Sequence, residues 1–386
     1  MKENMMQNRL IAKTFFGMEE VCAKELKSLG ANNVEILNRA VAYDYDPGIM
    51  YKTNLWSRTA LLILKDIANF KITKQDDLYD QLKLIEWDNH FEVHKTISIK
   101  SNINKSIFNN SHYVSLKAKD AIADYFRDKC GERPSVDTEN PQVKINVHIF
   151  EDNCSVSLDS SGDPLFKRGY RRNLGEAPIN ECLAAGLLMM GNYSPDIPLI
   201  DPMCGSGTFA IEASLMATNT APGSFRKDFV FQNWKDFDKT LWDNLVNEAK
   251  DSVKDVKFDI TAFDISSTSI SDARQNILRA DMLGRINLFR QDFFKYSPPP
   301  GPGMLIVNPP YGQRLKERNL PEFYGNIGKM LKFNYMGYNA WIISSEKEAM
   351  KKIALKPFSK NRLYNGPLEV LFYGYSLYEG SKKTKE

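Results

Sequence analysis

The sequence predicts an α/β protein in which an α+β region precedes a doubly wound parallel sheet with an antiparallel hairpin at its edge. Strand-like runs alternate with helical segments from about residue 196 onward, which is typical of a parallel sheet with helices on both faces. Near the C-terminus, "NRLYNGPLEVLFYGYSL" contains two strand-like segments joined at Asn365–Gly366, a typical hairpin turn. Residues 70–165 contain too few strand–helix–strand units for a second doubly wound sheet.

Three regions are expected, with boundaries at residues 1–69, 70–165 and 166–386. In the first, apolar residues from Met18 to Leu26 recur at helical spacing, and Gly30 is expected to end that helix. Two short strand-like runs follow this helix.

In the second region, "KTISIKS" alternates polar and apolar residues as a half-buried strand does. An amphipathic helix is predicted over Ser115–Cys130, ended by Gly131. Two further strands, joined by a turn at Asp152–Asn153, complete the α+β pattern.

In the third region, strands are predicted in "IPLID", "DITAFD", "INLF", "GMLIV" and "YNAWIIS". One helix is expected to begin near Thr208, and another to run from Ser267 to Leu283 and end at Gly284. The long segment between the first two of these strands is predicted to be an insertion.

The composition excludes several classes of protein. No apolar run approaches the length of a membrane span, and the first twenty residues lack the apolar segment of a signal peptide. The five cysteines are scattered and odd in number, and neither they nor the four histidines show metal-ligand spacing. We therefore expect a cytoplasmic protein with reduced thiols, no metal and no membrane partner. The net charge of +3 alone indicates no partner.

The run "LIDPMCGSGTFA" places glycines where a first strand meets its helix. Gly205 and Gly207 remove side chains, so a ligand can approach the backbone closely, and the helix N-terminus offers free N–H groups to an anion. A phosphate-binding P-loop is excluded because no Lys follows at the required spacing. The alternative is an ordinary turn. The predicted cofactor contacts in this run are Asp201, Met203, Cys204, Gly205, Ser206, Gly207 and Thr208.

Carboxylates also follow the second and third strands. An acid at the position of Asp264 accepts hydrogen bonds from ribose hydroxyls in doubly wound folds, and Ile265 follows it. Asp292 is expected to accept from an adenine amino group, while the ring of Phe293 stacks on the base. Alternatively, Asp264 only caps the next helix and Asp292 is a loop carboxylate.

The fourth strand ends in Asn308, Pro309, Pro310 and Tyr311. An exocyclic amine on a base is a poor nucleophile, and two acceptors on its hydrogens would help it to attack a methyl group. The side-chain oxygen of Asn308 and the carbonyl of Pro309 are predicted to be these acceptors; Asn308 is also expected to border the cofactor. Pro310 would fix the corner, and Tyr311 would stack on a flipped base. The alternative is a strand-ending turn with a buried tyrosine.

Together these segments resemble the S-adenosylmethionine-dependent amino methyltransferases that carry an N-P-P-Y motif. The segments "SLKAKDAIADYFRDKCGERPSVD" and "INVHIFEDNCSVSLDSSGDPLFKRGYR" resemble a THUMP domain, and "GEAPINECLAAGLL" and "APGSFRKDFVFQNW" resemble the large-subunit rRNA N2-guanine methyltransferases. The resemblance implies a ferredoxin-like N-terminal subdomain, a THUMP RNA-binding domain and a Rossmann-like methyltransferase domain. It also implies S-adenosyl-L-methionine as the cofactor and a guanine in 23S rRNA as the substrate. Some members of the family carry another methyltransferase domain after this one, and because this sequence ends at Glu386 we expect a single modification. One departure is Asn180, which stands where the subfamily usually has Lys.

Cations near aromatic residues are expected to contact structured RNA, where phosphate contacts and shape dominate. The predicted RNA-binding residues are Lys100, Lys117, Lys119, Arg133, Arg168 and Arg171. The alternative is that these side chains are simply solvated.

Several functions remain open from the sequence. The motif chemistry also suits N6 of adenine, and tRNA is an alternative substrate to rRNA. An RNA-binding ribosome-assembly protein without activity is the non-enzyme alternative. The modified nucleotide and the oligomeric state are not predicted.

Overall fold

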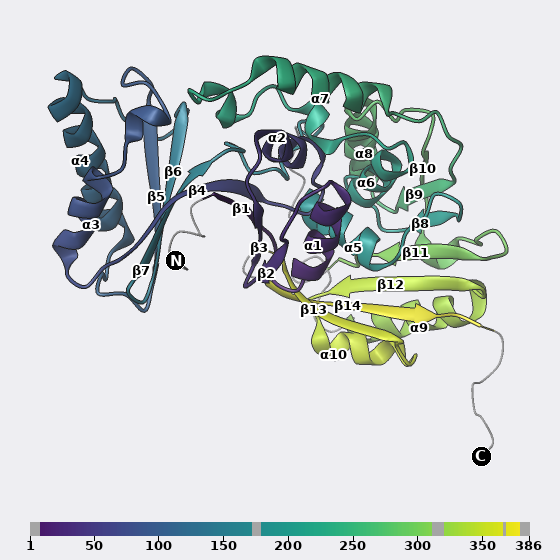
Figure 1. Ribbon diagram of the computed structural model, residues 1–386. Coiled ribbons are helices and arrows are strands. Elements are labelled where there is room, and N and C mark those ends of the chain that lie inside the picture. Colours follow the sequence, from purple (N-terminus) through teal and green to yellow (C-terminus); the bar gives the residue numbers. More distant parts are fainter. Residues whose placement is uncertain (1–7, 172–178, 311–319, 366–367, 379–386) are drawn as a thin grey trace. The chain divides into compact units, whose positions relative to one another are not determined.

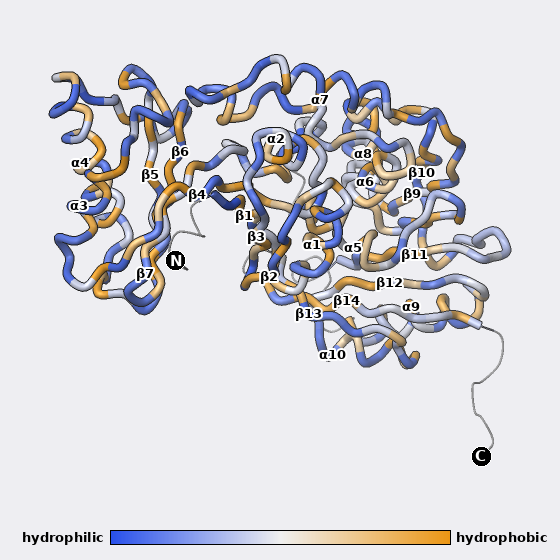
Figure 2. The backbone as a smooth tube through the Cα atoms, viewed as in Figure 1, coloured by the Kyte–Doolittle hydropathy of each residue, from blue (hydrophilic) through white to orange (hydrophobic). Residues whose placement is uncertain are grey.

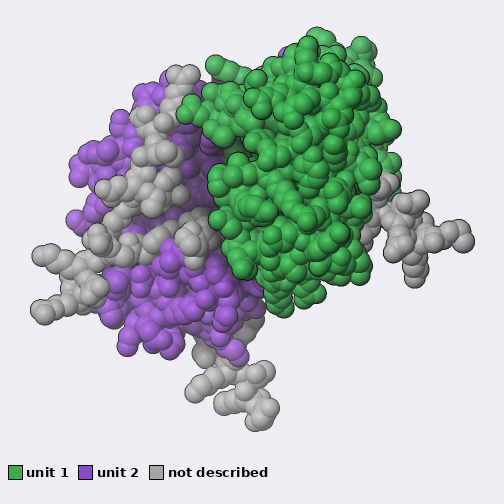
Figure 3. Space-filling view, turned by 90° about the vertical axis from the view of Figure 1, so that its left-hand side faces the viewer, with its two compact units in different colours: residues 1–14, 22–165, 226–248 green, residues 15–21, 166–225, 249–386 purple. Residues whose placement is uncertain are grey.

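Two separate seven-stranded sheets organise the chain (Figure 1). The computed structural model describes residues 8–171, 179–310, 320–365 and 368–378. Residue contacts divide the chain into two compact units, coloured separately in Figure 3. Unit 1 comprises residues 1–14, 22–165 and 226–248, and unit 2 comprises residues 15–21, 166–225 and 249–386.

The sheet of unit 1 has the strand order β2-β3-β1-β4-β7-β6-β5. Its strands are β1 (Arg9–Lys13), β2 (Glu35–Leu37), β3 (Ala40–Asp44), β4 (Leu62–Lys71), β5 (Ile97–Asn104), β6 (Val143–Phe150) and β7 (Asn153–Asp159). All neighbouring strands are antiparallel except β5 and β6. The long strand β4 pairs with β1 through its first half and with β7 along most of its length, so one sheet continues past residue 69.

The helices before residue 131 are α1 (Glu19–Ser28), α2 (Pro47–Trp56), α3 (Gln75–Lys83), the short turn η2 (Trp87–Asn89) and α4 (Ser111–Cys130). Helix α4 begins four residues earlier than predicted, because the side chain of Asn110 accepts from the N–H groups of His112 and Tyr113 and caps it there. Its end at Gly131, in the left-handed conformation, is as predicted. Figure 2 shows hydrophobic and hydrophilic residues mixed along this helix, as expected for a helix with one buried face.

The predicted insertion packs largely with unit 1. Its elements are η3 (Pro222–Phe225), η4 (Val230–Asn233) and α7 (Lys239–Asp251). The ring of Phe231 stacks on Tyr51 with centroids 4.6 Å apart, and Asp236 forms an ion pair of 2.7 Å with Lys65. Residues 226–248 are therefore part of the N-terminal unit, although they lie between two strands of the C-terminal sheet in the sequence.

The sheet of unit 2 has the order β10-β9-β8-β11-β12-β14-β13. Its strands are β8 (Leu199–Asp201), β9 (Ile260–Asp264), β10 (Asn287–Arg290), β11 (Gly303–Val307), β12 (Tyr338–Ser344), β13 (Ser359–Asn365) and β14 (Leu368–Ser376). The first five in this order are parallel, whereas β14 and β13 form an antiparallel hairpin at the edge. This arrangement confirms the predicted fold class. Gly366, half of the predicted turn, lies outside the described residues.

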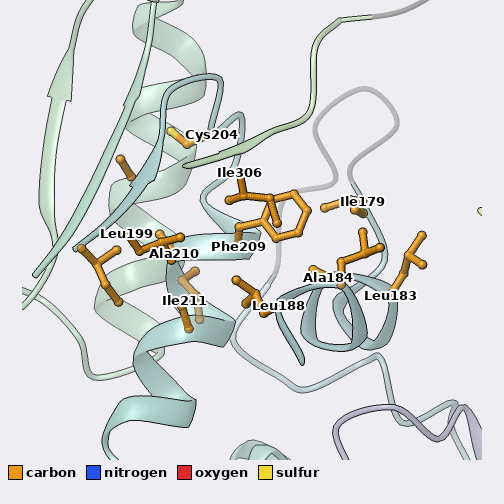
Figure 4. Close-up of a cluster of buried hydrophobic side chains, with 14 of the residues drawn as sticks. Ile179, Leu183, Ala184, Leu188, Leu199, Cys204, Phe209, Ala210, Ile211 and Ile306 are labelled. Atoms are coloured by element: carbon orange, nitrogen blue, oxygen red, sulfur yellow. The ribbon is translucent and has the colours of Figure 1, made fainter. Parts of the chain in front are cut away.

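Helices cover both faces of this sheet. They are α5 (Glu181–Met190), α6 (Thr208–Ala217), α8 (Ser267–Arg279), α9 (Leu320–Asn334) and α10 (Lys347–Met350), with short turns η5 (Phe293–Lys295) and η8 (Lys351–Ile353). Along β11, Met304 and Ile306 join the core beneath α5, α6 and α8, while Leu305 and Val307 join the core beneath α9. Figure 4 shows side chains from α5, α6, β8 and β11 gathered in the first of these cores. Within the described ranges, no helix is long and apolar enough to cross a membrane.

Candidate active site

The carboxyl ends of four parallel strands carry the predicted site. β8 lies between β9 and β11 in the sheet, and the helices that follow β8 and β9 cover one face while the helix after β11 covers the other. Ligands of doubly wound sheets bind at such a point, where the strand order reverses. Asp201, Asp264 and Asn308 stand at or directly after these strand ends, and Asp292 follows β10.

The glycine turn after β8 leaves room for a ligand. Gly205 has a φ of +51°, and apart from its two chain neighbours no described residue has an atom within 4 Å of the position that its Cβ would occupy. Gly207 has a φ of +82°, and a Cβ there would lie 3.2 Å from the Cβ of Ala273 on α8. Gly207 is also the N-cap residue of α6, and no side chain in the described part of the protein caps that helix. The first N–H groups of α6 are therefore available to an acceptor in a ligand.

The side chain of Asp264 links the loop after β8 to the loop after β9 by hydrogen bonds. One of its carboxylate oxygens accepts from the N–H of Gly205 at 3.0 Å, and the other accepts from the N–H of Ser266 at 2.9 Å. The cap of α8 is Ser266, whose hydroxyl accepts from Ser269, so capping is not the role of Asp264. Each carboxylate oxygen has a second lone pair that can accept from a ribose hydroxyl.

A role for Asn276 on α8 was not predicted from the sequence. Its side chain is buried and donates to the carbonyl of Ser206 at 3.1 Å, in the middle of the glycine turn. A polar residue on the apolar face of an amphipathic helix is the one feature of the sequence that indicates such a role.

The residues that follow β9 and β10 differ in exposure. Ile265 is 63% exposed, so its side chain is free to pack on a ligand. Asp292 accepts from the N–H of Phe294 at 3.0 Å and caps η5. Phe293 is only 3% exposed, and its ring stacks on Tyr335 with centroids 5.9 Å apart. The ring that was expected to stack on adenine thus lies in the core, because its side chain points to the α9 face of the sheet.

Asp201 is fully buried at the end of β8. Neither of its carboxylate oxygens has a hydrogen-bond partner among the described residues. Burial, and then the charge of Asp264, raise the pKa of Asp201 well above its usual range. Cys204 is also buried, and burial raises the pKa of its thiol in the same direction. Met203 is partly buried and packs against the core on the α9 face.

Asn308 carries a buried acceptor at the end of β11. Its side-chain oxygen is shielded from solvent and has no hydrogen-bond donor in the described part of the chain. Buried polar atoms without partners are rare in folded proteins, and functional sites are one place where they occur. Pro309 is buried beside it and Pro310 is partly exposed. Tyr311 lies outside the described residues.

The structure places two of the six predicted RNA contacts beside buried carboxylates of unit 2. The guanidinium of Arg168 is 2% exposed and lies 3.5 Å from the buried carboxylate of Glu212. Arg171 forms a 3.2 Å ion pair with Glu181, and its side chain is 8% exposed. Burial raises the pKa of Glu181, and the charge of Arg171 opposes that shift. Both arginines are therefore cationic partners of carboxylates that are buried in unit 2, on α5 and α6.

Three others line a groove of about 1070 Å³ in unit 1. Lys117 pairs with Asp76 at 2.7 Å and Lys119 pairs with Asp120 at 2.8 Å. Arg133 is exposed and has no ion-pair partner in the described ranges. The groove also presents exposed apolar and aromatic side chains, which are Tyr113, Leu116 and Val136. The sixth residue, Lys100, is exposed on β5 and does not line the groove.

A doubly wound sheet with a glycine turn, strand-end carboxylates and Asn-Pro-Pro after the fourth strand is typical of a Rossmann-like methyltransferase. The chain belongs to the RMKL-like methyltransferase family, whose domain model matches residues 168–373. A THUMP domain matches residues 73–159, and an RlmL ferredoxin-like domain matches residues 9–64. These matches confirm the resemblance that the sequence motifs predicted.

The chain is 39% identical over 364 residues to a Synechocystis protein named "Putative RNA methyltransferase", with 94% of this chain and 95% of that one covered. It is 38% identical over 379 residues to the ribosomal RNA large subunit methyltransferase K/L of Marinomonas, with 95% of this chain covered. It spans 52% of that relative's length. A crystal structure of a "putative methyltransferase" complexed with S-adenosylhomocysteine matches with a TM-score of 0.88 at 29% identity, covering 97% of this chain and 99% of that one. That ligand agrees with the predicted cofactor.

Proposed function

We propose that this protein transfers a methyl group from S-adenosylmethionine to an exocyclic amine of a flipped base in RNA, and that this amine is N2 of a guanine in large-subunit rRNA. The observation that carries the proposal is the buried and unpartnered side-chain oxygen of Asn308 at the end of β11, where no described residue donates to it. A target amine has two hydrogens to donate, and it gains nucleophilicity when both are held by acceptors. The family resemblance favours guanine N2 over adenine N6.

The residues of this chain would act mainly by orientation and electrostatics. Asn308 and the carbonyl of Pro309 accept from the amine, and these bonds strengthen as positive charge develops on its nitrogen. Pro310 restricts the backbone of the corner. Tyr311 is proposed to stack on the flipped base. The cofactor supplies the electrophilic methyl group, and the proton that the amine loses after transfer can pass to water.

The residues present fit S-adenosylmethionine. The space in front of Gly205 admits a ligand close to the backbone. The carboxylate of Asp201, without a partner in the described ranges, suits a cationic ligand, which would favour its ionised form. Asp264 has lone pairs for the ribose, and the exposed Ile265 together with Asp292 suits the adenine. Met203, Cys204, Ser206 and Thr208 complete the proposed cofactor contacts.

We assign the three predicted regions to separate roles. Residues 1–69 are proposed as the ferredoxin-like subdomain, residues 70–165 as the THUMP domain and residues 166–386 as the methyltransferase domain. Within the last of these, residues 226–248 are an insertion that packs with unit 1. The RNA would contact the groove lined by Lys117, Lys119 and Arg133, whose cations outnumber its carboxylates. The exposed Lys100 is a further proposed contact.

Replacing Arg133 by Gln should weaken RNA binding and reduce the salt dependence of that binding. A lost phosphate contact lowers the slope of log affinity against log salt by about one. The measurement is filter binding of an rRNA fragment between low and moderate salt. Lys352→Gln, a change of the same charge at an exposed site of unit 2, is the control and should leave both affinity and slope unchanged. An unchanged slope in Arg133→Gln would contradict a phosphate contact at this groove.

Methyl transfer to RNA can be tested directly. Purified protein is incubated with labelled S-adenosylmethionine and either RNA or DNA from cells that lack the enzyme. We expect label in RNA and none in DNA. Label in DNA alone would contradict the proposal, and label in neither would favour the inactive assembly protein.

A further inference from the structure

Residues 168–171 lie in the connector between β7 and α5 and contact one face of α6. Arg168 lies 3.5 Å from the carboxylate of Glu212, and the hydroxyl of Tyr170 donates to the same carboxylate at 2.9 Å. Arg171 donates to the hydroxyl of Thr208. Thr208 and Glu212 are four residues apart in α6, so their side chains lie on the same face, one turn apart. We call residues 168–171 the connector clamp.

The clamp depends on a glycine within it. Gly169 has a φ of +114°, and a Cβ there would lie 2.4 Å from the carbonyl oxygen of Phe225. The backbone thus turns tightly between the two arginines, against a neighbouring segment of chain. This turn allows Arg168 to reach the second turn of α6 while Arg171 reaches the first.

Arg171 is fixed on several sides. Besides its ion pair of 3.2 Å with Glu181, the first residue of α5, it donates to the carbonyl of Ile179 at 3.3 and 3.4 Å. The planar guanidinium presents its donors in a rigid fork, so these partners determine its position relative to α5 and α6 together. Its third partner, the hydroxyl of Thr208, is thereby also fixed.

The hydrogen bond from Arg171 determines what Thr208 can offer to a ligand. A hydroxyl has one hydrogen to donate and two lone pairs. Because Arg171 is a donor only, it uses a lone pair and leaves the hydrogen of Thr208 free to point to another acceptor. Thr208 directly follows Gly207, where the uncapped N–H groups of α6 begin. An anionic group bound there would accept from the helix end and from a hydroxyl polarised by a guanidinium.

We infer that Arg171 is a positioning residue, which holds Thr208 so that its hydroxyl binds the carboxylate of the methionine part of S-adenosylmethionine. The inference rests on the proposed function, since it requires that this cofactor binds across the glycine turn. Arg171 acts through Thr208 and does not touch the cofactor. Asn180 accepts from the N–H groups of Cys182 and Leu183 and caps α5, the helix that begins with Glu181, the ion-pair partner of Arg171.

Comparing the binding of two ligands distinguishes this positioning role from a general disturbance of the cofactor site. S-adenosylhomocysteine carries the amino acid part, whereas 5′-methylthioadenosine keeps the adenosine and the thioether but lacks it. Calorimetry measures both affinities for the wild-type chain and for Arg171→Lys, Thr208→Val and Thr208→Ser. Lys keeps the charge but cannot make the forked contacts. Val removes the hydroxyl and leaves the Arg171–Glu181 pair in place, so this variant answers the question even if Arg171→Lys does not fold. Ser keeps the hydroxyl.

Arg171→Lys and Thr208→Val should each weaken S-adenosylhomocysteine binding by about 10- to 100-fold, as for a lost hydrogen bond to a charged group. Their affinity for 5′-methylthioadenosine should stay close to that of the wild type, and Thr208→Ser should behave as the wild type with both ligands. Equal losses for the two ligands would overturn the inference. So would unchanged S-adenosylhomocysteine affinity with weakened RNA binding, which is the result expected of a phosphate contact. Wild-type protein that bound neither ligand would overturn the proposed function itself.

Discussion

Replacing Asn308 by Ala should reduce turnover by roughly 100- to 1000-fold, by analogy with the loss of one donor from an oxyanion hole. The variant lacks the buried acceptor at the end of β11, which has no donor among the described residues of the free protein. The missing interaction belongs mainly to the transition state, because positive charge on the target amine develops only as the methyl group is transferred. Affinity for the cofactor should therefore change far less than kcat.

The measurement is single-turnover methyl transfer to unmodified rRNA, with cofactor affinity determined separately by calorimetry. Asn334→Ala, at an exposed position at the end of α9, is the matched control and should retain full activity. Because a buried amide oxygen with no donor among the described residues costs stability, Asn308→Ala is expected to unfold at a temperature no lower than that of the wild type. A variant with normal turnover would remove Asn308 from the mechanism.

Asp264→Ala should weaken S-adenosylmethionine binding by about 1–3 kcal/mol, because ribose hydroxyls would lose their acceptor. The structure adds a second contribution to this loss. The carboxylate also accepts from the N–H groups of Gly205 and Ser266, so its removal frees the glycine turn from the end of β9. The expected effect is on cofactor affinity, with RNA binding by unit 1 unchanged.

Asp264→Asn separates the two contributions, since it keeps one oxygen acceptor and the size of the side chain. It should lose less affinity than Asp264→Ala. Asp255→Ala, which removes an exposed carboxylate before β9, is the control and should bind the cofactor normally. Unchanged affinity in Asp264→Ala would refute the ribose assignment.

The parallel strands of the second sheet could be predicted because each of them carries its own local pattern. The apolar run of β11 ends at two prolines that cannot continue a ladder, and the run of β9 ends at Asp264 before a capped helix. Polar residues after strands of one parallel sheet meet at one edge, so their proximity follows from the topology alone. For this reason Asp201, Asp264, Asp292 and Asn308 could be grouped by their positions at the ends of apolar runs in the sequence.

The roles of the connector arginines could not be predicted, because they depend on distant partners. Arg168 and Arg171 resemble solvated or RNA-binding cations in the sequence, yet buried carboxylates on α5 and α6 bind them. Glu212 lies in an apolar helix, and a buried acid there needs a cation from elsewhere in the chain. The burial of Phe293 could not be predicted either, because it depends on which face of the sheet the side chain points to.

The boundaries between the three regions and the packing of distant segments were the least predictable parts of the fold. The strand β4 joins two sets of strands into one sheet, although its two halves pair with segments far apart in sequence. The aromatic residues Phe231 and Trp242 of the insertion pack around Tyr51, which lies far earlier in the chain. No pattern in the sequence of the insertion indicates this contact. Nothing in a local pattern specifies such partners, since periodicity reports which face is buried and not what covers it.

The chemical nature of the methylated product tests most directly which base, in which RNA, the protein modifies. Purified protein, unmodified large-subunit rRNA and labelled S-adenosylmethionine are incubated together, and the RNA is then digested to nucleosides and identified by mass spectrometry. Our account predicts label in N2-methylguanosine from the rRNA, and no such label with the Asn308→Ala variant. Label in N6-methyladenosine, or strong transfer to tRNA with none to rRNA, would contradict it.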